Sequence, residues 1–182
     1  WSITKFDDIM AVDTNHKVFS SEAKLGGIAI QDMHSVEGGL ELEMFIAMDP
    51  PKHDQQRKAV TSAVAPSNLQ LLEPTIRERA CQILDDLPVG EDIDWVDKVS
   101  IELTTMTLAT LFDFPWEERR KLTRWSDITT AAPETGIVES YDARREELIE
   151  CAMYFKGLWE QRINEEPKND LISIMAHSPA TR

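Results

Sequence analysis

The sequence has few cysteines and no motif that would use them together. Cys81 and Cys151 are the two cysteines in 182 residues, and no Cys-x-x-Cys pair is present. A disulfide scaffold or a structural zinc site needs several cysteines or histidines at characteristic spacings. The sequence therefore argues against both classes and predicts two free thiols, which is the usual state in a reducing cytoplasm.

Long apolar runs and positive charge are also scarce. No apolar run approaches the roughly 18 residues that indicate a membrane span. Lys and Arg number 19 against 33 Asp and Glu, which gives a net charge of −14. Proteins that bind nucleic acid or anionic membranes need a basic face. We therefore expect neither nucleic acid nor a membrane as a partner. The Gly-x-Ser-x-Gly, His-Glu-x-x-His and phosphate-loop motifs are absent as well.

What is present fits an ordinary globular protein. Hydrophobic residues make up 42% and charged residues 29% of the chain, and its length suffices for one domain with a core. The chain starts at Trp1 rather than Met and stops at Arg182 shortly after a helical pattern. We expect residues 1–182 to form one domain that is truncated at both ends.

The apolar periodicity predicts a mainly α fold with minor β. Asp49 precedes two prolines, which is typical of an N-cap followed by the first turn of a helix. Asp170 is a second predicted cap. A strand end is expected near residues 1–5, a short helix from Asp7, and loops over 25–45 and 131–140. The longer predicted helices cover residues 51–64, 68–87, 96–112, 115–130, 141–164 and 171–177. In the helix over 115–130, one apolar stripe is formed by Leu122, Trp125 and Ile128. In the helix over 141–164, the predicted buried face consists of Leu148, Ala152, Phe155 and Trp159.

The helix after Asp49 carries a pair of basic side chains. His53 and Arg57 are four positions apart, so they project from one helix face, about 40° apart around the axis. Such a pair can grip an anionic group, because the Arg fork suits a carboxylate and His adds a second donor. Lys52 and Lys58 make this segment a basic island in an acidic chain. On spacing alone, a solvated helix face with a chance His-x-x-x-Arg is the more ordinary interpretation.

Five segments of the chain have a sequence typical of a known family. They are Trp1-Ser-Ile-Thr-Lys-Phe-Asp-Asp-Ile-Met, Met48-Asp-Pro-Pro-Lys-His-Asp-Gln-Gln-Arg57, Leu72-Glu-Pro-Thr-Ile-Arg, Leu111-Phe-Asp-Phe-Pro and Asn169-Asp-Leu-Ile-Ser-Ile. In this order they resemble a bacterial cytochrome P450 over essentially the whole chain. The detailed sequence around residues 45–51 and 176–182 resembles the subgroup that hydroxylates medium-chain alkanes at the terminal carbon. The resemblance implies the N-terminal and central part of that fold, from its B helix to its H helix.

The resemblance also implies a heme b cofactor. At the matching positions of the family, the His and Arg bind the heme propionates, which assigns that role to His53 and Arg57. The family's oxygen-activating helix, its Glu-x-x-Arg pair and its loop with the cysteine ligand have no counterpart in the sequence. Cys81 and Cys151 lie in predicted helices, whereas a heme thiolate comes from a loop with backbone N–H donors. We therefore predict no iron ligand within these residues.

The resemblance further implies a small apolar substrate, O₂, and electrons from a ferredoxin and its reductase. Apolar loop residues are candidates for the substrate pocket, and the same residues would suit loops that fold back on the core. The candidates are Ile28, Met44, Phe45 and Ile137. The basic island around His53 is a candidate docking face for an acidic ferredoxin. Alternatives are a fatty-acid or terpenoid P450, an all-helical domain that senses apolar ligands, and a helical scaffold.

Overall fold

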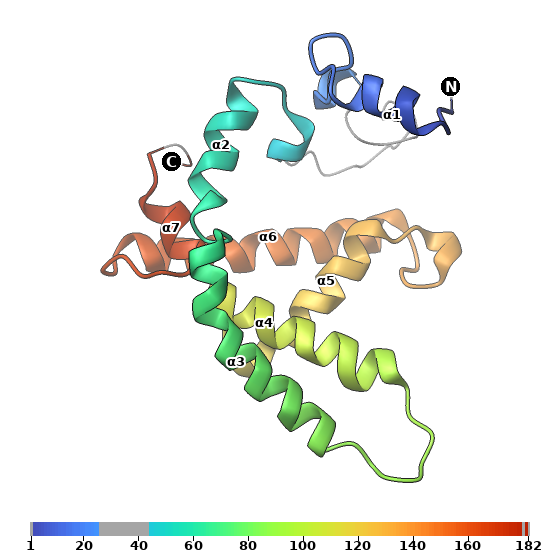
Figure 1. The fold of residues 1–182 in the computed structure, drawn as a ribbon, viewed down its shortest axis with the longest axis vertical. Coiled ribbons are helices and arrows are strands. Elements are labelled where there is room, and N and C mark those ends of the chain that lie inside the picture. The colour runs from blue at the N-terminus through green and yellow to red at the C-terminus, as the bar shows by residue number, and fades with distance from the viewer. Residues whose placement is uncertain (1, 26–43, 180, 182) are drawn as a thin grey trace. The chain divides into compact units, whose positions relative to one another are not determined.

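The structure is a computed structural model that describes residues 2–25, 44–179 and 181. The chain divides into two compact units, Trp1–Lys58 and Ala59–Arg182. The described residues form helices and connecting loops, with no strand among them (Figure 1). The mainly α fold is thus confirmed, but the strand expected near residues 1–5 is not seen over residues 2–4. A strand needs a neighbouring strand to satisfy its backbone hydrogen bonds, and no described segment supplies one.

The first unit contains α1 (Phe6–Asp13), η1 (Ala23–Leu25), η3 (Phe45–Ala47) and the start of α2 (Lys52–Thr61). The carboxylate of Asp49 accepts a hydrogen bond from the Ser20 hydroxyl and one of 3.0 Å from the Ser21 backbone N–H. These two donors hold the pKa of Asp49 below its usual value. Asp49 was predicted to cap the helix with its side chain. Instead its side chain ties two parts of the chain together, and its backbone carbonyl accepts from the N–H of His53.

The second unit contains the remaining helices, and each predicted long helix is found there or in α2. The largest differences between the predicted and the observed helix bounds are at the N-terminal ends. Pro66 opens the helix that was expected to begin at Asn68, since proline suits the first helical turn, and residues 96–101 form a π-helical turn. The elements are α3 (Pro66–Asp85), η4 (Val96–Ile101), α4 (Glu102–Phe112), η5 (Trp116–Glu118), α5 (Arg120–Thr130), η6 (Pro133–Thr135), α6 (Tyr141–Ile163) and α7 (Leu171–His177).

Side-chain caps fix the starts of the last two helices. The Ser140 hydroxyl accepts from the N–H of Ala143 at 3.1 Å and opens α6. Asp170 accepts from the N–H of Ser173 at 2.8 Å and opens α7, as the sequence predicted. These bonds satisfy N–H groups that the helix itself leaves without partners.

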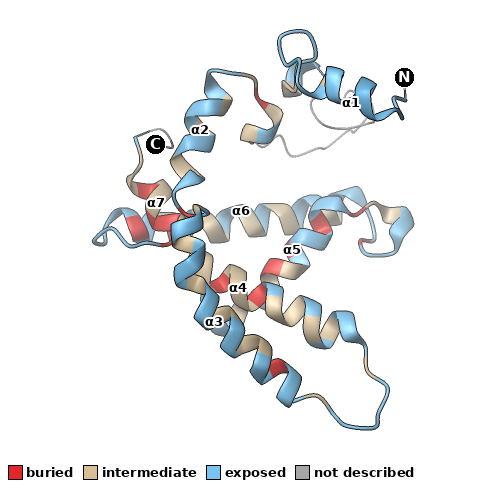
Figure 2. Ribbon diagram, viewed as in Figure 1, coloured by how far each residue is buried: buried red, intermediate tan, exposed pale blue. Residues whose placement is uncertain are grey.

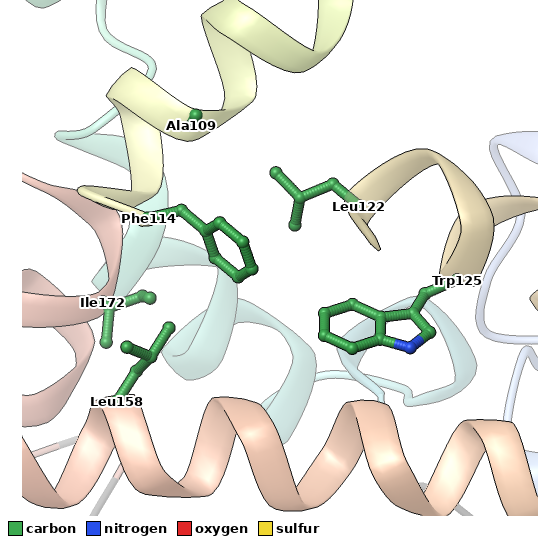
Figure 3. Close-up of a cluster of buried hydrophobic side chains, with 6 residues drawn as sticks. All are labelled: Ala109, Phe114, Leu122, Trp125, Leu158 and Ile172. Carbon is green, nitrogen blue, oxygen red and sulfur yellow. The ribbon is translucent and has the colours of Figure 1, made fainter. Parts of the chain in front are cut away.

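The main core of the second unit lies among α4, α5, α6 and α7 (Figures 2 and 3). Figure 3 shows Phe114, Leu122 and Trp125 pointing towards one another in the space above the helix that carries Leu158. The Phe114 ring contacts Trp125 edge-on at 6.3 Å between centroids, and Tyr154 stacks on Phe114 at 5.1 Å. Burial of each large apolar side chain stabilises the fold by about 1.5–3 kcal/mol, so this cluster is what holds the four helices together.

A partly buried carboxylate, that of Glu102, joins α4 to α5. Both oxygens of Glu102 accept from guanidinium groups, Oε1 from Nε of Arg119 at 3.0 Å and Oε2 from Nη2 of Arg120 at 2.7 Å. Arg120 also reaches Asp97 at 2.9 Å. Burial alone would raise the pKa of Glu102, but the hydrogen bonds and charges of the two arginines outweigh it and hold that pKa below the ordinary 4.5.

We expect this network to make stability depend on pH. Because the folded-state pKa of Glu102 is lowered, its contribution is fully present above pH 4.5 and is lost as the pH falls through the folded-state pKa. Glu102→Gln should lower the free energy of unfolding by about 1–3 kcal/mol at pH 7. The difference from wild type should shrink below pH 4.5, as urea titrations at several pH values would measure.

Glu146→Gln is the control for this prediction, because Glu146 is an exposed carboxylate on α6. It should change stability by less than about 0.5 kcal/mol at any pH. If the effect of Glu102→Gln were the same at pH 7 and pH 3, the ionised form of Glu102 would have no special role.

Candidate functional site

The basic pair lies on α2, as the sequence predicted, within four positions on one face. The His53 side chain is partly buried, and its Nδ1 lies 2.8 Å from Oδ1 of Asp54. This contact engages Nδ1, so Nε2 is the nitrogen that a ligand would meet. The Arg57 side chain is exposed on the same face. The pair therefore presents the Arg57 guanidinium and the Nε2 atom of His53 on one face of α2.

One predicted pocket residue lies directly against this pair. The Phe45 ring contacts the His53 ring edge-on, with 6.1 Å between the ring centroids. Phe45 opens η3, and its backbone carbonyl accepts from the N–H of Met48, which helps to close the turn that leads into α2. An apolar ring beside the His53–Arg57 pair is suited to a ligand with an apolar body and anionic tails.

The other predicted pocket residues have different surroundings. Met44 precedes η3 and is exposed. Ile137 belongs to the second unit, where it follows η6 and is 43% exposed. Ile28 lies outside the described residues. A shared role for these three residues in substrate binding stays a prediction.

The donor set on α2 suits carboxylates rather than a metal ion. Within residues 2–25, 44–179 and 181, no group of three His, Cys, Asp or Glu side chains is placed to hold a metal. Cys81 is exposed on α3, and Cys151 is partly buried on α6, where burial raises the pKa of its thiol. A thiol with a raised pKa is a poor source of the thiolate that iron requires. Burial on α6 thus disfavours Cys151 as a source of thiolate.

A hollow in the second unit was not foreseen from the sequence. It has a volume of about 530 Å³ and lies among the side chains of Arg79, Phe114, Trp116 and Arg162. Arg79 donates to the Met106 carbonyl and stacks over the Trp116 ring at 4.7 Å. Arg162 donates to Asp113 at 2.7 Å and to Glu165 at 3.1 Å. Both guanidinium groups thus bind other groups of the protein, and we assign them a structural role.

Comparison with known proteins decides the family. No family model matches the chain. The steroid C26-monooxygenase of Mycolicibacterium smegmatis is 31% identical over 95% of this chain and 40% of its own length. The structure of cytochrome P450-153 from Novosphingobium aromaticivorans superposes over all of this chain and 45% of its own, with 43% identity and a TM-score of 0.85. This chain belongs to the cytochrome P450 family.

Membership of the cytochrome P450 family implies heme as the cofactor. The linalool 8-monooxygenase of Pseudomonas putida is a further P450 relative, 28% identical over 98% of this chain and 45% of its own length. The chain thus spans less than half the length of these P450 relatives. None of the helices described for this P450 chain is both long enough and apolar enough to cross a bilayer.

Proposed function

We propose that the chain is the B-to-H helix part of a heme-dependent monooxygenase that hydroxylates unactivated C–H bonds. The observation that carries this proposal is the 43% identity to cytochrome P450-153 over the whole chain, with a TM-score of 0.85. Heme, when bound, supplies the activation of O₂ and the transfer of one oxygen atom to carbon. The residues of this chain bind and orient the cofactor and shape the space for the substrate.

In this proposal His53 and Arg57 hold the heme propionates. A carboxylate that enters a low-dielectric site needs a charge-assisted partner. Arg57 offers a planar fork, and His53 can donate from Nε2 when both ring nitrogens carry a proton, since Nδ1 faces Asp54. Both side chains come from one face of α2. Phe45, edge-on to His53, supplies apolar contact beside them.

We propose medium-chain alkanes as the substrates and the terminal carbon as the position of attack. An alkane has no group to hydrogen-bond, so its orientation must come from the shape of an apolar pocket. The candidate lining residues are apolar and have no polar side-chain atoms other than the Met44 sulfur. They are Ile28, Met44, Phe45 and Ile137.

Fatty acids and terpenoids are the second candidate substrates. The names of related P450s favour them, since one relative is a linalool 8-monooxygenase and another is a steroid C26-monooxygenase. A myxobacterial P450 that is 29% identical, with a TM-score of 0.60, was solved in complex with myristic acid. The regulator and scaffold alternatives have no comparable support, because both relatives are named as monooxygenases.

The electrons are proposed to come from a ferredoxin and its reductase, with α2 as part of the docking face. Lys52, Arg57 and Lys58 give this helix a positive charge in a chain of net charge −14. Such a local excess favours an acidic partner and speeds the encounter. We also propose a cytoplasmic location, which is consistent with the two free thiols.

The test is a comparison of substrates with the complete enzyme. Octane, octanoic acid and linalool would be titrated side by side while the heme absorbance is followed, and the products would be identified by mass spectrometry. We expect octane to bind at least about tenfold more tightly than octanoic acid, because the lining offers no partner for a carboxylate, and to yield mainly 1-octanol. Tighter binding and faster turnover of octanoic acid or linalool would instead support the second candidate.

A further inference from the structure

Both ends of the loop between α5 and α6 are held by a single side chain. Arg144 lies in the first turn of α6 and reaches back to the end of α5. Its Nε donates to the Ile128 carbonyl at 3.0 Å, and its Nη2 donates to the Thr129 carbonyl. The last carbonyls of a helix have no partners within the helix, and a cation there is favoured by the helix dipole. Arg144 thus clamps the end of one helix to the start of the next.

The loop 131–140 has its own small core, separate from the main one. Ile128 is fully buried, and Ala131 and Val138 are almost fully buried against it, with Leu148 of α6 packed alongside. Val138 therefore fixes the second half of the loop from the inside. Its neighbour Ile137 is 43% exposed. The loop thus directs the Val138 side chain inward and the preceding Ile137 side chain outward.

Local hydrogen bonds further define the turn before Ile137. The Thr135 hydroxyl donates to the Ala132 carbonyl at 2.6 Å, and the N–H of Ile137 lies 3.4 Å from the same hydroxyl. Gly136 has a φ of +73°, a left-handed conformation that glycine adopts without strain. The direction in which Ile137 points is thus set by the turn before it, the buried Val138 after it and the clamp at both ends.

We infer that Arg144 is a positioning residue: by clamping α5 to α6 it holds the loop 131–140 in the conformation that presents Ile137 to the substrate. This inference rests on the proposed function, which makes Ile137 part of the substrate pocket. It adds a residue that touches no substrate and yet sets which carbon of the chain is attacked. If the loop were mobile, an alkane could bind at several depths in the pocket. An isoleucine held in one position limits how deeply the alkane can enter.

The helix pair offers a matched control for this inference. Arg124 of α5 pairs with Glu147 of α6 through an exposed ion pair. Arg124→Gln removes a link between the same two helices and leaves the clamp at the loop intact. Arg144→Gln removes the clamp, and Arg144→Lys keeps a cation that can still donate to the carbonyls.

The experiment compares these variants with Ile137→Ala in the complete enzyme, using the best of octane, octanoic acid and linalool as substrate. We expect Arg144→Gln to raise KM about three- to tenfold with little change in kcat and to increase the share of products oxidised at neighbouring carbons, because a substrate that is less well placed loses uniform binding. Arg144→Lys should restore most of the wild-type product ratio. Arg124→Gln should leave KM and the product ratio within about twofold.

A double variant and amide exchange make the outcome decisive. Arg144→Gln should add no further change in product ratio to Ile137→Ala, since both act through one side chain. The amide protons of residues 134–138 should exchange about tenfold faster in Arg144→Gln, because two charge-assisted bonds are lost. Unchanged exchange, or faster exchange with an unchanged product ratio, would overturn the inference. A preference for octanoic acid or linalool would contradict the proposed substrate and leave this test valid. If Ile137→Ala changed neither KM nor the products, both the substrate contact of Ile137 and the positioning role of Arg144 would be overturned.

Discussion

Replacing Trp125 with alanine is expected to lower the free energy of unfolding by about 3–5 kcal/mol, the usual cost of deleting a large buried aromatic side chain. Trp125 is 4% exposed, and its ring lies 6.3 Å from that of Phe114 and 5.4 Å from that of Tyr154. Its loss leaves a cavity where α4, α5 and α6 meet. Urea unfolding followed by circular dichroism would measure the change.

Trp95→Ala is the matched control, because Trp95 is 55% exposed just before η4. It removes the same ring from a surface position, and the expected loss is below about 1 kcal/mol. Similar losses for the two variants would mean that the packing around Trp125 contributes little beyond what a surface ring contributes.

Arg57→Ala in the complete enzyme is expected to weaken heme retention about ten- to a hundredfold. A charge-assisted hydrogen bond contributes about 1.5–3 kcal/mol, and the proposed propionate partner would be left buried without it. Heme transfer to an excess of apomyoglobin, followed by absorbance, measures the rate of loss. His53→Ala should act in the same direction.

Lys58→Ala controls for the general loss of positive charge from α2, since Lys58 is an exposed cation next to Arg57. It should leave heme retention within about twofold of wild type. Equal effects of Arg57→Ala and Lys58→Ala would indicate a nonspecific charge effect, and no effect of either would remove Arg57 from the propionate role.

The helices of this P450 were largely predictable because their signals are local. Asp170 caps α7 through its own side chain, and Leu122, Trp125 and Ile128 form the buried stripe of α5 that their spacing predicted. The face of α6 was only partly predictable. Its periodicity favoured Ala152 as buried, yet Ala152 is exposed and Leu158 is buried instead. Which of two adjacent stripes faces inward depends on the rotation of the helix against its neighbours, and the sequence of one helix does not contain that information.

The contacts that position loops could not be predicted from the sequence for the same reason. Arg144 is part of an Arg-Arg-Glu-Glu run that is typical of a solvated face, yet its guanidinium caps a helix 15 positions earlier in the chain. Glu102 likewise has no sequence motif that announces its two arginine partners. By contrast, His53 and Arg57 could be proposed as a pair because their relation is confined to one helical turn.

The position of Ile172 in the core has a consequence for the folding of the second unit during synthesis. Ile172 is 2% exposed and belongs to the same cluster as Ala109, Leu122 and Leu158, although it comes from α7, which follows their helices in the chain. A ribosome releases a chain from its N-terminus onwards, so α4, α5 and α6 emerge before the side chain that completes their shared interior. Until α7 follows, the apolar surface that Ile172 covers stays exposed, so this interval of synthesis is the one in which the unit is most prone to aggregation.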